Sequence, residues 1–203
     1  MDLLTLESLP EGLRNGISYR NLAAKEMLFQ HGDAASAFFV VETGRVKLVR
    51  YTSGDKMVTF QVAGVGESLG EVALFSDTYP CGAIAELPSR VIVYPKELLL
   101  SALRDNSDLA QDFIAMLVGK IQALKLRLEL QNIRKAHERV LQYLRYQVQG
   151  EQNVINFDRP LKDIAADLGL TPETLSRALT KLEQEGVIMR SRLVITLQNS
   201  SAA

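Results

Sequence analysis

The hydrophobic period of the chain changes near Asp108, and this change restricts the folds that the sequence can adopt. From about Ser18 to Pro95 the period is two, and turn residues interrupt it at Gly32-Asp33, Thr43-Gly44 and Ser53-Gly54-Asp55. The alternating apolar residues include Val46, Leu48, Phe60 and Val62. Many short strands without intervening helices are typical of a β-sandwich, barrel or jelly roll. After Asp108 the period is close to 3.6, which indicates a helix well above the mean length of about 11–12 residues.

This long helical stretch carries apolar residues on two faces. One stripe steps by three and four residues and consists of Leu109, Phe113, Leu117, Ile121, Leu124 and Leu128. A second stripe consists of Leu126, Leu130 and Ile133. Because a helix that is apolar on two sides must bury both, we expect one stripe to lie on the β domain and the other to meet the same helix of a second chain. The expected dimer seam is Leu117, Ile121, Leu124 and Leu128. The alternative is a core helix within one chain.

The C-terminal third alternates short helical and strand patterns after a joint near residues 131–135. A helix over 137–149 is expected to end at Gly150, and a short strand over 153–158 follows it. Residues 161–168 predict another helix, and residues 187–197 predict a β hairpin. Between them, residues 161–186 have the pattern of a helix-turn-helix.

The helix-turn-helix pattern is carried by turn and capping residues as well as by apolar ones. Gly169 supplies the positive φ of the turn, Thr171 is a suitable N-cap, and Pro172 at the first helical position loses no needed N–H. Gly186 is expected to end the second helix. The residues expected to pack inward are Ile164, Ala165, Leu168, Leu170, Leu175, Leu179 and Leu182.

Three polar residues share one exposed face at the start of the second helix. Glu173, Ser176 and Arg177 stand at i, i+3 and i+4, opposite the leucines. A recognition helix enters the DNA major groove by its N-terminal end. There arginine can bind guanine O6 and N7, glutamate can accept from cytosine N4, and serine can approach a base edge. The alternative is a solvated Glu–Arg pair worth about 0.2–0.5 kcal/mol to the helix.

The residues quoted above resemble the CRP/FNR family of transcription regulators. Glu173, Ser176 and Arg177 match the E-x-x-S-R pattern of the FNR branch, whereas Pro172 stands where the cyclic-AMP branch has a further arginine. The resemblance implies an α+β fold with a jelly-roll β domain of the cyclic-nucleotide-binding type (1–107), a dimerisation helix (108–132) and a winged helix-turn-helix (133–203). It also implies a TTGAT-type half-site and its inverted copy, in place of TGTGA, and RNA polymerase as a partner.

Phosphate contacts position a recognition helix without specifying sequence. The candidates for these contacts are Thr171, Thr174, Lys181, Arg190 and Arg192. The net charge of −1 argues against indiscriminate coating of nucleic acid, and residues 133–203 carry a small excess of basic side chains.

The family's phosphate-binding cassette is only half present in this sequence. Its first half matches at residues 70–74, but Pro80, Cys81 and Gly82 stand where an arginine and a hydroxyl are needed. A buried cyclic phosphate without an opposite charge would be costly. The long helix also lacks the Thr-Ser pair that meets adenine in cyclic-AMP binders. The candidate effector pocket consists of Gly70, Glu71, Ala73, Leu74, Cys81, Gly82, Leu124 and Lys125.

No cofactor is expected, with a cyclic nucleotide or a haem on Cys81 or His31 as alternatives. One cysteine cannot hold the iron–sulfur cluster of the FNR sensor, and no metal site is expected.

The composition, the acidic N-terminus and the lack of a long apolar run predict a cytoplasmic protein without a membrane span. No catalytic motif is present, so an enzyme is not expected. The rival function is a ligand-binding regulatory module that acts without DNA.

Overall fold

The computed structural model describes residues 6–54, 56–148, 153–157, 160–191 and 194–198. Its internal contacts divide the chain into two compact units, Met1–Met116 and Leu117–Ala203. The division falls inside helix α3 (Ser107–Asn132), which begins one residue before the expected position.

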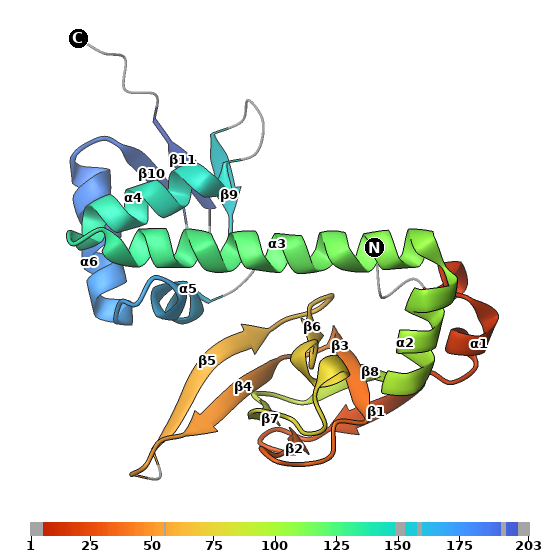
Figure 1. Cartoon of the computed structure of the whole chain (residues 1–203). Helices are drawn as coiled ribbons and strands as arrows, with labels where there is room; N and C mark the ends of the chain where they lie inside the picture. The colour runs from red at the N-terminus through yellow and green to blue at the C-terminus, as the bar shows by residue number, and fades with distance from the viewer. Residues whose placement is uncertain (1–5, 55, 149–152, 158–159, 192–193, 199–203) are drawn as a thin grey trace. The chain divides into compact units, whose positions relative to one another are not determined.

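The first unit is built from two antiparallel four-stranded sheets (Figure 1). One sheet has the order β1 (Ser18–Leu22), β8 (Ser89–Pro95), β3 (Ala37–Thr43) and β6 (Ser68–Leu69). The other has the order β2 (Met27–Phe29), β7 (Gly82–Ala85), β4 (Val46–Tyr51) and β5 (Met57–Ala63). One core cluster takes side chains from strands of both sheets, among them Phe39, Val41, Val46 and Ala83. The predicted double-sheet β domain is therefore confirmed.

The turn between β3 and β4 requires glycine. Gly44 has φ +87°, and a Cβ atom at this position would lie 2.6 Å from both the Ser89 Cα and the Pro88 carbonyl oxygen. Farther along the β4–β5 hairpin, Val46 and Leu48 are buried, but Phe60 is 40% exposed. The alternating pattern predicts a buried Phe60, and this prediction is wrong. Phe60 lies on β5, a strand at the edge of its sheet, and the Arg50 guanidinium lies 5.8 Å from the centroid of its ring.

Short helices complete the first unit. They are η1 (Leu6–Ser8), α1 (Glu11–Arg14), η2 (Val72–Phe75) and α2 (Lys96–Asp105). Helix α2 has no counterpart among the sequence-based predictions. It packs on β8 and α1 and buries Leu99 completely.

The apolar residues of helix α3 are buried in other places than predicted. Leu109 and Phe113 are buried in the first unit, where the Phe113 ring lies edge-on to Phe38 with centroids 5.8 Å apart. Leu130 is buried in the core of the second unit, and Leu126 and Ile133 pack against that core. The second stripe therefore belongs to the C-terminal core, and the prediction that it would lie on the β domain or a second chain is wrong.

Between these two anchored ends, α3 exposes a row of large apolar side chains, which we call the α3 stripe. Its members and their exposed fractions are Ile114 (58%), Val118 (45%), Ile121 (51%), Leu124 (59%) and Leu128 (63%). Leu117, from the predicted seam, is half-buried.

The described part of the second unit contains three further helices and one small sheet. The helices are α4 (Ala136–Gln147), α5 (Leu161–Asp167) and α6 (Pro172–Gln184). The sheet has the antiparallel order β10 (Ile188–Ser191), β11 (Val194–Leu197) and β9 (Val154–Asn156). Helix α4 ends at Gln147, earlier than predicted, and Gly150 lies outside the described residues. The helix-turn-helix and the hairpin are confirmed.

Candidate nucleic-acid interface

Gly169 makes the tight turn between α5 and α6 possible. Gly169 has φ +62°, a left-handed conformation that glycine adopts without steric cost. Its N–H donates to the Ala166 carbonyl over 3.0 Å, and the Leu170 N–H donates to the Ala165 carbonyl over 2.8 Å. These two bonds satisfy carbonyl groups that the end of a helix leaves unpaired. Leu170 then packs against the core, as the sequence predicts.

The start of α6 is fixed by its cap. Thr171 has extended backbone angles, and its Oγ1 accepts a 3.2 Å hydrogen bond from the Thr174 N–H. Pro172 occupies the first helical turn, where a missing N–H costs nothing. The predicted N-cap is therefore confirmed, and the first turn of α6 is held in one conformation.

The two faces of α6 separate as predicted. Leu175, Leu179 and Leu182 are each 1% exposed and form part of the core of the second unit. Glu173, Ser176 and Arg177 are all exposed at the N-terminal end of the helix. The Arg177 Nε donates to the Glu173 carbonyl over 3.4 Å, which keeps the side chain along the helix. Three polar groups of different hydrogen-bonding type thus stand together on one accessible face.

Glu173 is held in its ionised form. Its pKa is lowered first by a hydrogen bond from its own backbone N–H, then by one from the Thr171 side chain and by the charge of Arg177. An ionised carboxylate only accepts hydrogen bonds. Glu173 is therefore suited to an amino group such as cytosine N4.

Farther along α6, Lys181 lies among basic and acidic side chains. The Lys181 Nζ lies 3.4 Å from the His137 Nε2 on α4 and 3.7 Å from the Glu185 carboxylate. Beside them, a hydrogen bond from Lys135 is the main cause of a lowered pKa at Glu138, and the charges of His137 and Lys181 act in the same direction. Sequence reasoning missed His137 because it precedes α6 by many residues, and only the packing of α4 on α6 brings it close.

The wing residue Arg190, whose phosphate contact stays a prediction, has partners within the second unit. Its Nη2 lies 3.0 Å from the Glu183 carboxylate and 3.4 Å from the Thr180 hydroxyl, so it joins β10 to α6. The prediction of a phosphate contact missed this internal partner. Arg192 lies outside the described residues.

Arg139 fastens the helix-turn-helix to the end of α3. Its guanidinium donates to the Ile133 carbonyl over 2.7 and 3.0 Å, to the Gln131 carbonyl over 3.3 Å and to the Leu168 carbonyl over 2.8 Å. All these acceptors lie at or just beyond the ends of α3 and α5, where helix carbonyls lack intrahelical partners. The Arg139 side chain thus supplies hydrogen-bond donors to carbonyl groups at the ends of both α3 and α5.

We expect Arg139→Lys to lower the free energy of unfolding by about 1–2 kcal/mol, because an ammonium cannot reach both helix ends in the planar geometry of guanidinium. Chemical denaturation followed by circular dichroism measures the loss. Lys135→Arg, at an exposed position on the same segment, is the control. Equal midpoints for Arg139→Lys and the wild type would contradict this role.

The candidate effector residues fall in both units. Gly70 has φ +86°, and the Glu71 Oε1 accepts a 2.6 Å hydrogen bond from the buried Ser68 hydroxyl. Ala73, Leu74, Cys81 and Gly82 are buried in the first unit. Leu124 and Lys125 are exposed on the part of α3 that belongs to the second unit. The effector pocket therefore stays a prediction.

Cys81 lies in the core of the β domain. Burial raises the pKa of its thiol, and the nearby Arg50 guanidinium only partly opposes that effect. Burial still favours the neutral thiol.

The fold and this interface together define a class of protein. A double-sheet sensor-type domain, a long helix and a winged helix-turn-helix with a capped, polar-tipped second helix are the parts of a DNA-binding regulator. Residues 19–106 match the cyclic nucleotide-binding domain, and residues 138–202 match the Crp-like helix-turn-helix domain.

Individual relatives agree with both matches. The chain is 27% identical to the cyclic AMP receptor protein of Thermus thermophilus, over 88% of this chain and 84% of the relative. It is 28% identical to the fumarate and nitrate reduction regulatory protein of Salmonella typhimurium, over 87% of this chain and 73% of the relative. A solved structure of a putative cAMP-binding regulatory protein from Silicibacter pomeroyi has a TM-score of 0.59 at 27% identity, covering 95% of this chain and 89% of that one. The chain belongs to the CRP/FNR family of transcription regulators, which bind DNA through the helix-turn-helix.

Two further findings concern the described part of the chain only. None of its helices combines the length and apolar character that crossing a membrane requires. No group of three or more His, Cys, Asp or Glu side chains in it is arranged to hold a metal ion.

Proposed function

We propose that this protein is a cytoplasmic homodimeric regulator that reads a TTGAT-type palindrome. The observation that carries the proposal is the exposed group Glu173, Ser176 and Arg177 on the capped first turn of α6. Arginine pairs with guanine through O6 and N7, and an ionised glutamate accepts from cytosine N4. Pro172 offers neither a donor nor a charge, so the TGTGA site of the cyclic-AMP branch would lack one arginine contact. RNA polymerase is the proposed protein partner.

The α3 stripe supports the homodimer. Leu124 is 59% and Leu128 is 63% exposed, and both belong to the predicted seam with Ile121. Isolated apolar residues on a surface are ordinary, but a row at helical spacing is typical of a helix that packs against another. A second copy provides an identical row, which gives an isologous interface.

Fluorescence anisotropy with three duplexes tests the proposed specificity. We expect the TTGAT palindrome to bind more tightly than the TGTGA palindrome, and both to bind more tightly than a scrambled duplex. Equal affinity for all three would refute sequence-specific reading. Absence of binding to any duplex at low salt would favour the rival, a regulatory module that acts without DNA.

We propose that the phosphate contacts come from Thr171, Thr174 and Lys181, and we add His137 because it lies beside Lys181. Lys181 and His137 lie 3.4 Å apart on two different helices, beside the recognition face. Such contacts strengthen binding to every sequence and release counterions.

We expect Lys181→Ala to weaken binding to the specific and scrambled duplexes by the same factor. The slope of log K against log salt should become shallower by about one, because one phosphate contact is lost. Anisotropy titrations across a salt series measure this slope. Lys56→Ala, in the first unit, should leave the slope unchanged. An unchanged slope in Lys181→Ala would contradict the contact.

No cyclic-nucleotide site is proposed. Glu71 accepts a hydrogen bond from Ser68, and none of residues 80–82 carries a charge, although the Arg50 guanidinium lies near Cys81. Regulation by the β domain is proposed to use another ligand or none, and the protein is proposed to act by binding and not by catalysis.

A further inference from the structure

The polar face of α6 extends beyond the three proposed base-reading residues. Thr180 follows Arg177 by three residues and Ser176 by four, so it lies on the same face, one turn farther along the helix. At about 100° per residue, Lys181 lies to one side of this face and Glu183 to the other. A helix in the major groove has a phosphate backbone on either side, so both sides of the face affect the affinity for DNA.

Arg190 reaches this face from the wing. It lies opposite Ile195 in the register of β10 and β11, and Ile195 is buried in the core of the second unit. Because directly opposite residues of an antiparallel pair share a face, Arg190 projects to the side of the sheet where α6 packs on β10. Its Nη2 lies 3.0 Å from the Glu183 carboxylate and 3.4 Å from the Thr180 hydroxyl.

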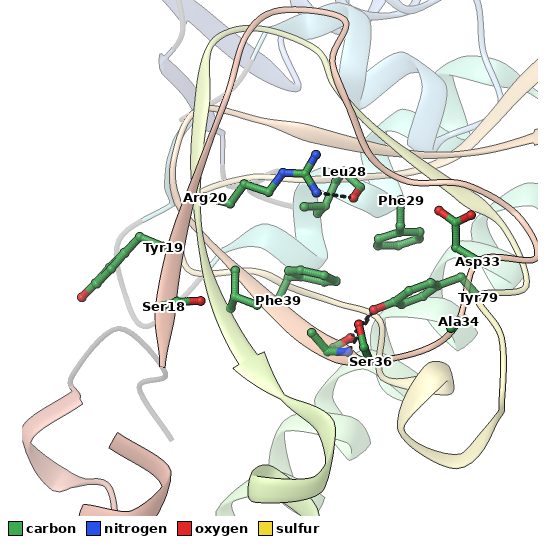
Figure 2. A pocket seen from close by; sticks show the side chains of 12 residues that line it. Ser18, Tyr19, Arg20, Leu28, Phe29, Asp33, Ala34, Ser36, Phe39 and Tyr79 are labelled. Carbon is green, nitrogen blue, oxygen red and sulfur yellow. Dashed lines mark hydrogen bonds between the residues drawn. The ribbon is translucent and has the colours of Figure 1, made fainter. Parts of the chain in front are cut away.

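Side chains alone hold Arg190 in this position. Both of its contacts use Nη2, and within the described residues neither Nη1 nor Nε donates a hydrogen bond. Arg20 in the β domain is held differently, because its Nη1 donates to the Leu28 carbonyl over 2.9 Å and its Nη2 to the Met27 carbonyl over 3.0 Å. Figure 2 shows the first of these two backbone bonds. Glu183, by contrast, is the one charged partner of Arg190 in the part of the chain that the structure describes.

The pair of Arg190 and Glu183 is tighter than the pair on the opposite side of α6. The Lys181 Nζ lies 3.7 Å from the Glu185 carboxylate, and both of these side chains are about half exposed. Arg190 and Glu183 are 3.0 Å apart and less exposed. Because solvent and salt screen less exposed charges more weakly, Glu183 offsets the charge of Arg190 more fully than Glu185 offsets that of Lys181.

We propose that Glu183 keeps Arg190 from contacting the DNA backbone and so weakens binding to every sequence alike. This inference rests on the proposed function, because it concerns one side of the same interface. In the wild type, the paired charges of Arg190 and Glu183 nearly cancel toward the phosphates beside them. A neutral residue at position 183 releases the guanidinium, whose planar donors suit a phosphate. Glu183 is thus a positioning residue that acts through Arg190.

Glu183→Gln is expected to tighten binding to the TTGAT palindrome and to the scrambled duplex by the same factor. The factor should be about fivefold for each bound chain, which is the upper range for an ion pair near the surface. The slope of log K against log salt should become steeper by about one for each bound chain, because one phosphate contact is gained. Fluorescence anisotropy titrations across a salt series measure both quantities. Glu183→Ala, which also removes the hydrogen-bond acceptor, should give the same pattern.

A double-mutant cycle with Arg190→Ala distinguishes the release of Arg190 from a simple change of charge. Arg190→Ala should weaken DNA binding by about twofold or less in the wild type, but by about fivefold for each bound chain in Glu183→Gln. Glu185→Gln removes the same charge from the other side of α6 and is the matched control. In that background Arg190→Ala should cost no more than in the wild type. Thermal unfolding checks the fold of each variant, and Glu183→Ala replaces Glu183→Gln if the latter does not fold.

Equal losses for Arg190→Ala in the wild type and in Glu183→Gln would overturn the proposal, because the two residues would then act as independent charges. A larger loss in the wild type would also overturn it, since Arg190 would then bind phosphate while it is paired with Glu183. In both cases the wild type would still prefer the TTGAT palindrome, and the proposed function would stand. A wild type that binds no duplex at low salt would contradict both the proposed function and this inference.

Discussion

Replacing two residues of the α3 stripe, Ile121→Glu with Leu124→Glu, is expected to convert the protein into a monomer. The two side chains are 51% and 59% exposed in one chain and would be buried against their copies in a dimer. Burying four carboxylates without partners in one interface costs far more than the apolar contact supplies. A monomer binds one half-site at a time, so affinity for the palindrome should fall by about 10²–10⁴-fold.

Sedimentation equilibrium measures the change of state, and anisotropy measures the affinity. Gln122→Glu adds a charge at an exposed position of the same helix, outside the stripe, and should remain dimeric. The double variant should bind a single half-site as weakly as the wild type binds it. A wild-type chain that is monomeric at micromolar concentration, or a double variant that stays dimeric, would contradict the proposed seam.

Arg177→Ala is expected to remove the strongest base contact of the recognition helix. A bidentate arginine–guanine pair discriminates against the wrong base by about 1–3 kcal/mol. The loss should appear in each half-site of a palindrome, and preference at the guanine position should relax. The cap at Thr171 and the buried leucines do not depend on Arg177, so the helix itself should remain folded.

Anisotropy with the TTGAT palindrome and with duplexes altered at the guanine of each half-site separates specific from general effects. Wild-type protein should distinguish the duplexes, and Arg177→Ala should bind them almost equally. Arg145→Ala removes an exposed arginine from the same unit, on α4, and should keep the discrimination. If Arg177→Ala weakened every duplex by one factor, Arg177 would be a phosphate contact and the proposed reading of guanine would be wrong.

The helix-turn-helix was predictable because its determinants are local. The positive φ of Gly169, the cap at Thr171 and the burial of Leu175 and Leu179 each depend on a few neighbouring residues, and all four are confirmed. The exposure of Glu173 and Arg177 follows from the same helical period.

Other features depended on how the elements pack together. Phe60 fits the alternation but lies on an edge strand, and Arg190 fits a wing cation but pairs with Glu183 on α6. The apolar residues of α3 repeat with one period along the helix. Leu109 is nevertheless buried in the first unit and Leu130 in the core of the second.

The hydrogen bonds of Arg139 link the end of α3 to the turn before α6. Arg139 donates to the Ile133 carbonyl just beyond α3 and to the Leu168 carbonyl beside the turn, so one guanidinium joins these two helix ends. We expect this linkage to couple the orientation of α6 to that of the last turn of α3. A variant without this linkage should hold α6 less firmly. We expect it to discriminate less between DNA sequences while it still binds DNA.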